Sequence, residues 1–180
     1  MGLSLDILTN LISESPELAA IGVAAGVAYG VYKTYQAHLD AQRKHDTKIF
    51  ERFELLLPER DFQYILDRLA IERLSLDESL KIDEALEWST LASNNFLRGP
   101  IHKSFHRFVR CLNILDSFIA DEFYSLDRNP MMSALGVRPI TTPEMAKHVE
   151  KMAPRLAELV HNVRECYREF RLIVKKELLQ

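Results

Sequence analysis

Two residues near the C-terminus have the types and spacing of a site for RNA cleavage. Arg155 and His161 are separated by five residues, so that an arginine which polarises a phosphate stands near a histidine which moves a proton. Chance alone produces this spacing in a chain with this many arginines and histidines, and Pro154 directly precedes the arginine. We therefore expect a solvated helix face and assign no catalytic residue, with RNA cleavage as the alternative.

The histidines and cysteines of the chain are its candidate metal ligands. His102 and His106 stand at i and i+4, where two imidazoles on one helix face can share a metal, but no carboxylate or cysteine completes the set. We expect a surface pair, no metal and no cofactor. Cys111 and Cys166 fit no metal or redox spacing, so we expect free thiols packed as small hydrophobes in a reducing compartment, with a disulfide as the alternative.

Basic residues cluster in two places. The first cluster is a stripe that is expected either to contact RNA, a nucleotide or a lipid headgroup, or to be a solvated face with acidic partners from the same chain. It consists of Arg98, Lys103, Arg107 and Arg110, and the acidic partners considered are Asp77, Glu78, Asp83, Glu84 and Glu87. The net charge of −3 and the pI near 6.1 argue against a dedicated nucleic-acid binder. The second cluster is expected near lipid and consists of Lys33, Arg43, Lys44 and Lys48.

Sequence motifs of the common enzyme classes are absent. The chain contains no Walker loop, no G-x-S-x-G, no H-E-x-x-H and no G-x-G-x-x-G. We therefore expect a protein without enzymatic activity, whose function depends on assembly.

A glycine zipper precedes the second basic cluster. Leu18 to Tyr32 contains no charged residue, and within it Gly22, Gly26 and Gly30 recur every four residues on nearly one helix face. Each glycine inside a helix costs roughly 1 kcal/mol relative to alanine. Close approach of a second helix is the compensation that such small-residue faces provide. We predict that these three glycines form the seam of a homo-oligomer.

The same segment is predicted to enter a membrane. It would span only ~22 Å of a hydrocarbon core of ~30 Å, so flanking residues must extend it. No Lys or Arg precedes residue 33, whereas five follow between residues 33 and 52, which favours a body on the cytoplasmic side. We expect residues 1–35 at the inner membrane of a prokaryote and residues 36–180 as a cytoplasmic helical body. The alternative is a cytoplasmic protein that buries the segment in an oligomer.

Helical periodicity dominates the rest of the chain. We predict an all-α fold in which one long helix ends before Pro58 and an antiparallel helical bundle follows. Starts are indicated at Ser15-Pro16 and Thr142-Pro143, and a kink or break at Pro154. An amphipathic stretch is expected over 3–14 and a loop over 125–141. The remaining helices are predicted over 60–74, 76–97, 100–124 and from 142 to about 178.

This layout resembles the small accessory membrane proteins of type VI-B CRISPR systems. That family joins an N-terminal membrane segment to a helical body of divergent HEPN-like character and assembles into a membrane pore. The motif that carries over is Arg155 with His161. The resemblance implies antiviral defence by membrane permeabilisation, with copies of itself, lipid, and a CRISPR effector or RNA as partners. A soluble oligomeric adaptor and a HEPN-like ribonuclease are the alternatives.

Overall fold

A computed structural model describes residues 16–125, 134–137 and 143–178 of the chain. The chain divides into two compact units, residues 1–42 and residues 43–180, and the division lies inside the first long helix. The sequence placed its boundary between residues 35 and 36. The predicted amphipathic stretch over 3–14 lies outside the described residues.

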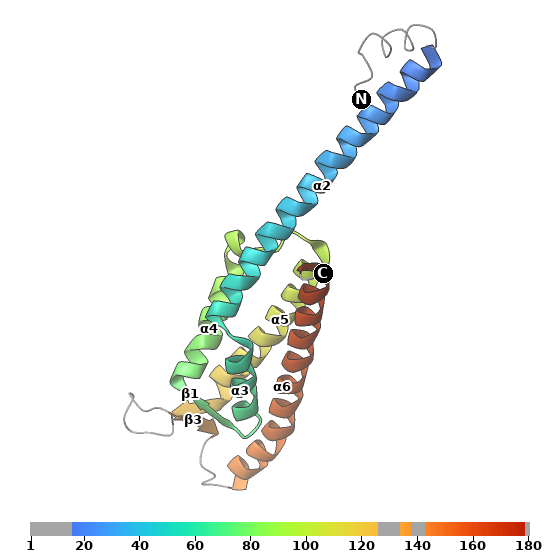
Figure 1. Ribbon diagram of the computed structural model, residues 1–180. Helices are drawn as coiled ribbons and strands as arrows, with labels where there is room; N and C mark the ends of the chain where they lie inside the picture. The colour runs from blue at the N-terminus through green and yellow to red at the C-terminus, as the bar shows by residue number, and fades with distance from the viewer. Residues whose placement is uncertain (1–15, 126–133, 138–142, 179–180) are drawn as a thin grey trace. The chain divides into compact units, whose positions relative to one another are not determined.

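Helices account for most of the described chain (Figure 1). They are α2 (Pro16–Leu56), α3 (Glu59–Leu69), α4 (Leu76–Thr90), α5 (Gly99–Glu122) and α6 (Pro143–Leu178), with a 3₁₀ turn at Ala92–Asn94. The predicted helical fold is confirmed and is compatible with a bundle. Both predicted helix starts and the stop before Pro58 are also confirmed. A proline is tolerated in the first turn of a helix and disfavoured in its interior, which accounts for all three positions. Helix α6 continues through Pro154, so the predicted break is wrong there, and the kink stays a prediction.

Helices α3 and α4 are shorter than predicted, for local reasons. Glu72 adopts the left-handed conformation (φ 59°), which cannot continue a helix, so α3 ends at Leu69 instead of residue 74. A capping box then starts α4, since Ser75 Oγ accepts from the backbone N–H of Glu78 and the Glu78 carboxylate accepts from the N–H of Ser75. Asn94 Nδ2 donates to the carbonyl of Trp88 at 2.9 Å, which ends α4 at Thr90 instead of residue 97.

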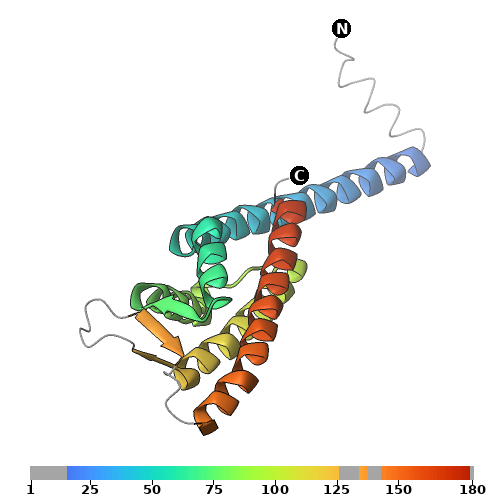
Figure 2. The ribbon, with the colours of Figure 1, turned by 90° about the horizontal axis from the view of Figure 1, so that it is seen from below.

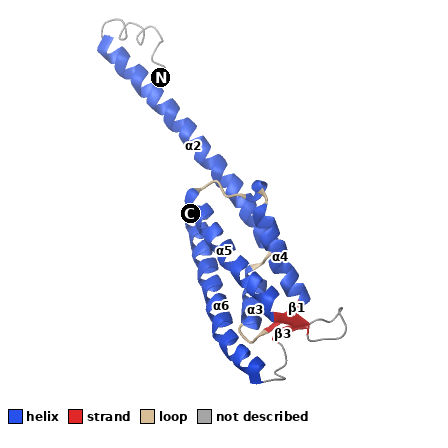
Figure 3. Cartoon of the chain, turned by 180° about the vertical axis from the view of Figure 1, so that it is seen from behind, coloured by secondary structure: helices blue, strands red, loops and turns tan. Residues whose placement is uncertain are grey.

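A small antiparallel sheet is the main departure from the predicted all-α fold (Figure 3). It consists of β1 (Arg73–Ser75), β2 (Phe123–Ser125) and β3 (Ala134–Val137) in the order β1-β3-β2. Leu74 pairs with Leu135, and Tyr124 pairs with Gly136. The sequence assigned these residues to helix ends and to a loop. Strands of three or four residues are too short for alternation to reveal them, and their partners are distant in sequence.

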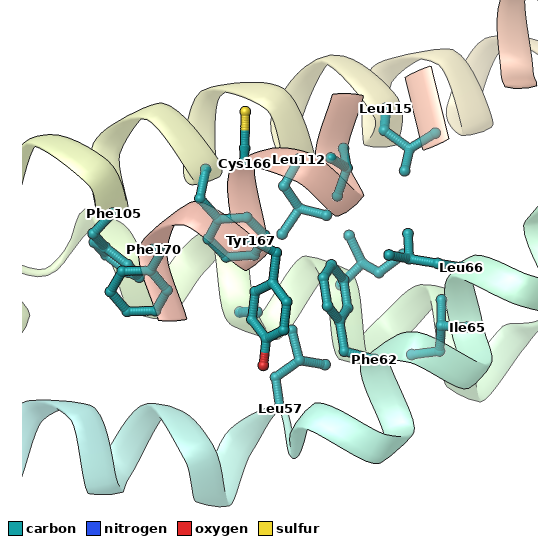
Figure 4. Packing of buried hydrophobic residues seen from close by; sticks show 14 of the residues in the cluster. Leu57, Phe62, Ile65, Leu66, Phe105, Leu112, Leu115, Cys166, Tyr167 and Phe170 are labelled. Carbon is teal, nitrogen blue, oxygen red and sulfur yellow. The ribbon is translucent and has the colours of Figure 1, made fainter. Parts of the chain in front are cut away.

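The core of the 43–180 unit is rich in aromatic side chains. Helices α5 and α6 lie side by side in both Figure 1 and Figure 2, and α3 and α4 pack against them. Figure 4 shows rings from α3, α5 and α6 meeting in this core. Phe53 of α2 is 1% exposed, and its ring centroid lies 5.5 to 6.1 Å from four other rings. Those rings belong to Trp88, Phe105, Phe108 and Phe170.

Most predicted inner positions are buried. Helical periodicity predicts seven inner positions on the last helix, and all are buried: Leu156, Leu159, Val160, Val163, Tyr167, Phe170 and Val174. The four that it predicts on α3 are buried too: Phe62, Ile65, Leu66 and Leu69. One prediction is wrong: Tyr35, which the same periodicity predicts as an inner position of the first long helix, is 58% exposed. Tyr35 continues the apolar pattern of α2 at a place that is not covered by the described chain, so periodicity alone does not report its burial.

A polar junction holds the start of α5. Asp46 of α2 is fully buried, and its carboxylate accepts from the backbone N–H groups of Leu97 (2.7 Å) and Arg98 (2.9 Å). The ring of His45 donates through Nε2 to the carbonyl of Asn95 at 3.1 Å. The negative charge therefore lies at the positive end of the α5 dipole, where a carboxylate is stabilising.

A second part of this junction caps the end of α6. Arg43 donates to the carbonyl of Leu178 from Nη2 (2.8 Å) and Nε (3.2 Å). Arg98 donates to the carbonyl of Glu177 and lies 3.1 Å from its carboxylate. Two guanidinium groups thus satisfy carbonyls that a helix end leaves without partners.

Candidate functional site

We call the glycine-containing part of α2, residues 18–32, the zipper segment, and its residues 23–32 are all exposed. Gly26 and Gly30 have no atom within 4 Å of the position that a Cβ would occupy. The large side chains of the segment are 60–68% exposed; they belong to Val23, Val27, Tyr29, Val31 and Tyr32. Gly22 lies in the same helix. The glycine face is therefore open to a partner among the residues described.

The C-terminal end of the zipper segment has the character of a polar boundary. Lys33 Nζ lies 5.8 Å from the centroid of the Tyr29 ring, a cation–π arrangement. Thr34 Oγ1 donates to the carbonyl of Gly30 at 2.9 Å, so its hydroxyl is satisfied within the helix. No helix in the described parts of the chain is long and apolar enough to cross a membrane.

The second basic cluster is divided between two environments. Lys33, Lys44 and Lys48 are exposed. Arg43 is instead partly buried against the end of α6 through its bonds to Leu178. Three of the four residues predicted near lipid therefore present their charge to solvent, while the guanidinium of Arg43 takes part in the α6 cap.

The first basic stripe does not act as one surface. Arg98 lies at the cap of α5 and binds the end of α6, and Arg107 pairs with Glu169 at 2.7 Å. Lys103 and Arg110 are exposed. The ion-pair partners of the stripe are thus Glu177 and Glu169 of α6, not the acidic residues of α4 that the sequence suggested.

One of those α4 acids has a different neighbour. Asp83 lies beside Asp116 of α5, and burial, followed by the charge and hydrogen bond of Asp83, raises the pKa of Asp116 to about 6. The two histidines expected as a surface pair, His102 and His106, do lie together, with ring centroids 4.3 Å apart. Burial, followed by the charges of His102 and Arg110, lowers the pKa of His106. No group of three metal-binding side chains occurs within the described ranges.

Arg155 and His161 do not converge within one chain. Both are exposed on α6, and Arg155 Nη1 lies 3.2 Å from the carboxylate of Glu158. A separation of six positions places them ~9 Å apart along the helix axis and ~120° apart around it. The arrangement therefore gives one chain no site in which the two side chains act on the same phosphate.

Two cysteines on adjacent helices are closer than the sequence suggested. Cys111 of α5 and Cys166 of α6 are free thiols whose Sγ atoms are 3.0 Å apart. The sulfur of Cys166 points away from the aromatic core in Figure 4. Burial, followed by its hydrogen bond to Cys111, raises the pKa of Cys166 to about 11. Cys111 is the more exposed thiol, so we expect it to react first.

Mild oxidation with hydrogen peroxide is expected to join Cys111 and Cys166 within one chain. The Cys111 thiolate reduces the peroxide to water and becomes a sulfenic acid, which the Cys166 thiol then attacks with loss of a second water. The intact mass should fall by two hydrogen atoms, and the link should raise the free energy of unfolding by ~2–4 kcal/mol. Cys111→Ser should abolish both changes. A disulfide-linked dimer as the main product would contradict this expectation.

Comparison with known proteins adds no relatives: neither a protein-family model, nor a curated protein, nor a solved structure matches this chain.

A further basic face was missed by the sequence analysis. It lies on α6 and consists of Arg164, Arg168, Arg171 and Lys175. The spacing of four, three and four residues is the signal that could have found it, since such positions share one helix face. Among the polar residues of this helix, the sequence indicated a possible role only for Arg155 and His161.

Proposed function

We propose that the protein is a homo-oligomer that assembles through the zipper segment at a membrane. The observation that carries this proposal is the open glycine face, because Gly26 and Gly30 lie in an uncharged stretch of helix with no atom near the Cβ position. Three glycines weaken an isolated helix, and a second copy of the same face offsets that cost by close backbone contact. The exposed valines beside the glycines would be buried in the same contact.

The membrane part of the proposal is supported by the distribution of charge. The zipper segment has no charged residue, and the exposed Lys33, Lys44 and Lys48 follow it. Under the positive-inside rule this distribution supports a cytoplasmic location for the 43–180 unit. Because the segment is short, we propose that association of several copies, which hides the glycine faces, makes insertion favourable. A C-terminal reporter that is active only in the cytoplasm tests the orientation.

A soluble oligomeric adaptor is the second candidate. It is favoured by the finding that no described helix is apolar and long enough to cross a membrane. In that case the same glycine face would pack inside a soluble helical assembly. Fractionation separates the candidates, since only the membrane form requires detergent for extraction.

The resemblance to the accessory proteins of type VI-B CRISPR systems extends the first candidate to membrane permeabilisation during antiviral defence. Dye release from lipid vesicles that contain the purified protein tests this extension. Retention of the dye in vesicles that hold the assembled oligomer would reject a pore.

Gly26→Leu is expected to break the oligomer while leaving the protein folded. A leucine at the central position would hold two helices apart, and a gap of ~0.5–1 Å already forfeits a quarter to a half of each dispersion contact. The substitution also makes the segment more apolar, so membrane binding should persist or increase. Cross-linking and light scattering in detergent measure the assembly, and membrane fractionation measures binding.

Ala24→Leu is the matched control, because Ala24 lies ~160° around the helix from Gly26. It adds a similar bulk and apolarity on the opposite face and should leave the oligomer intact. An oligomer of unchanged size in Gly26→Leu would reject the zipper contact. Equal loss of the oligomer in both variants would also reject it, because the effect would then not depend on the glycine face.

A further inference from the structure

A pocket of about 500 Å³ lies within the 43–180 unit, between α6 and the residues of α2 and α3 that face it. Its polar wall is the basic face of α6, and its apolar wall includes Phe50 and Leu172. Leu172 is 60% exposed although it is a large apolar residue. The pocket is therefore open to solvent and combines cations with uncovered apolar surface.

Two polar atoms at this pocket are buried without a hydrogen-bond partner. They are Nε of Arg164 and the hydroxyl of Tyr167, and both residues line the pocket. Tyr167 is 0% exposed, and Figure 4 shows its hydroxyl pointing away from Phe62 toward the end of α2. Burial raises the pKa of this hydroxyl, and the side chains of Arg171 and Glu54 lie close enough to interact with it, but neither forms a hydrogen bond of acceptable distance and angle with it. A buried donor without an acceptor is costly, so two at one pocket indicate that an acceptor-rich ligand belongs there.

The ion pairs around the pocket leave two of its cations weakly engaged. Four cations line it against two carboxylates, Glu59 and Glu165, and the carboxylates of Glu54 and Asp67 pair with two of these cations from outside the lining. Arg171 is held by Glu54 and Glu59, and Arg164 Nη2 lies 2.7 Å from Asp67. The ion pair of Arg168 with the exposed Glu165 is long, at 3.5 Å, and no ion pair of Lys175 is found in the described chain. These last two cations are the ones free to turn toward a ligand.

The position of Arg171 explains how the pocket keeps its form without a ligand. Its guanidinium carbon lies 5.0 Å from the centroid of the Phe50 ring and 5.8 Å from that of Tyr167, between the two carboxylates that bind it. Burial, which outweighs the charge of Arg171, raises the pKa of Glu54. The charged groups that fix the wall are thus distinct from those that remain available for binding.

We propose that this pocket binds the phosphate group of a small phosphate monoester whose apolar or aromatic part packs on Phe50 and Leu172. Phosphate offers several acceptor oxygens, which match the orphaned donors of Arg164 and Tyr167 and the side chains of Arg168 and Lys175. The proposal rests on residues of the 43–180 unit alone. It is independent of self-assembly through the zipper segment.

Calorimetric titration of the full chain in detergent with phenyl phosphate and with inorganic phosphate tests the proposal. We expect phenyl phosphate to bind with a Kd on the order of 0.1–1 mM and inorganic phosphate to bind more weakly. Arg168→Gln with Lys175→Gln should weaken phenyl phosphate binding ~10-fold, since both cations are solvated and their loss does not affect the core. Arg155→Gln, an exposed arginine of the same helix outside the pocket, is the matched control and should leave the affinity unchanged.

Tyr167→Phe separates a ligand-binding hydroxyl from a structural one. The change removes only the oxygen, so the phosphate affinity should fall ~10-fold while the thermal unfolding temperature of the free protein stays the same or rises. A fall in unfolding temperature without a change in affinity would assign the hydroxyl to folding and contradict the proposal. Absence of saturable binding for both phosphates would overturn it. So would affinities that are the same in Arg155→Gln and in the pocket variants. Equal affinity for the two phosphates would reject the part of the proposal in which the ligand packs on the apolar wall of the pocket.

Discussion

Asp46→Ala is expected to lower the free energy of unfolding of the 43–180 unit by ~3 kcal/mol, a fall of roughly 6–12 °C in Tm. The carboxylate is fully buried and accepts two backbone N–H groups at the start of α5. Alanine removes both charge-assisted bonds and leaves the donors without an acceptor. It also removes the negative charge that complements the helix dipole. Thermal denaturation followed by circular dichroism measures the change.

A graded series identifies the cause of that loss. Asp46→Asn keeps one acceptor oxygen but loses the charge and the second acceptor, so its stability should fall between those of the wild type and Asp46→Ala. Glu51→Ala removes an exposed carboxylate from the same helix and should have little effect. If Asp46→Asn proved as stable as the wild type, neither the charge nor the second hydrogen bond at the α5 start would contribute to stability.

Phe53→Ala is expected to have the largest effect of any single substitution considered, with a loss of ~3–5 kcal/mol. The ring is 1% exposed and meets four other rings from α4, α5 and α6 at centroid distances of 5.5 to 6.1 Å. Its removal leaves a cavity that rings held on separate helices can fill only in part. It also removes edge-to-face contacts, each contributing ~0.5–1.5 kcal/mol beyond burial. Chemical denaturation gives the free energy of unfolding directly.

Leu55→Ala is the control for this prediction. Leu55 lies two positions further along α2 but is 84% exposed, so the same kind of truncation should change stability by less than ~0.5 kcal/mol. Comparable losses in the two variants would mean that the loss at position 53 does not come from its burial and aromatic contacts, because alanine is a better helix former than either residue.

The helices could be predicted because each depends on neighbours within a few positions. Prolines at positions 16, 58 and 143 mark starts or stops, and the apolar stripe of α6 matches its burial. The sheet could not be predicted, because strand β3 gains its bonds only from residues of β1 and β2 brought to it by the helices. The left-handed Glu72 is a similar case, since nothing in its residue type requires that conformation.

For the site residues, too, local spacing could be predicted from the sequence, whereas partners that are distant in sequence could not. The glycine spacing predicted an oligomer seam, which stays a prediction, and Gly26 and Gly30 have free space around them. The basic stripe before and within α5 was identified, but its partners were not, because Glu169 and Glu177 become neighbours only when α6 packs beside α5. The buried hydroxyl of Tyr167 was interpreted only as part of an apolar stripe. Its lack of a hydrogen-bond partner is a property of the folded state alone.

The bonds from Arg43 to the carbonyl of Leu178 have a consequence for biosynthesis. These residues are 135 positions apart, so at ~5–20 residues per second a ribosome adds the second roughly 7–27 s after the first. The apolar side chains of Ile49 and Phe53 stay without their α6 contacts for most of that interval. The zipper segment, made before any of them, is available to a neighbouring nascent chain throughout. The order of translation therefore allows copies to meet through their first helix before their bodies have folded.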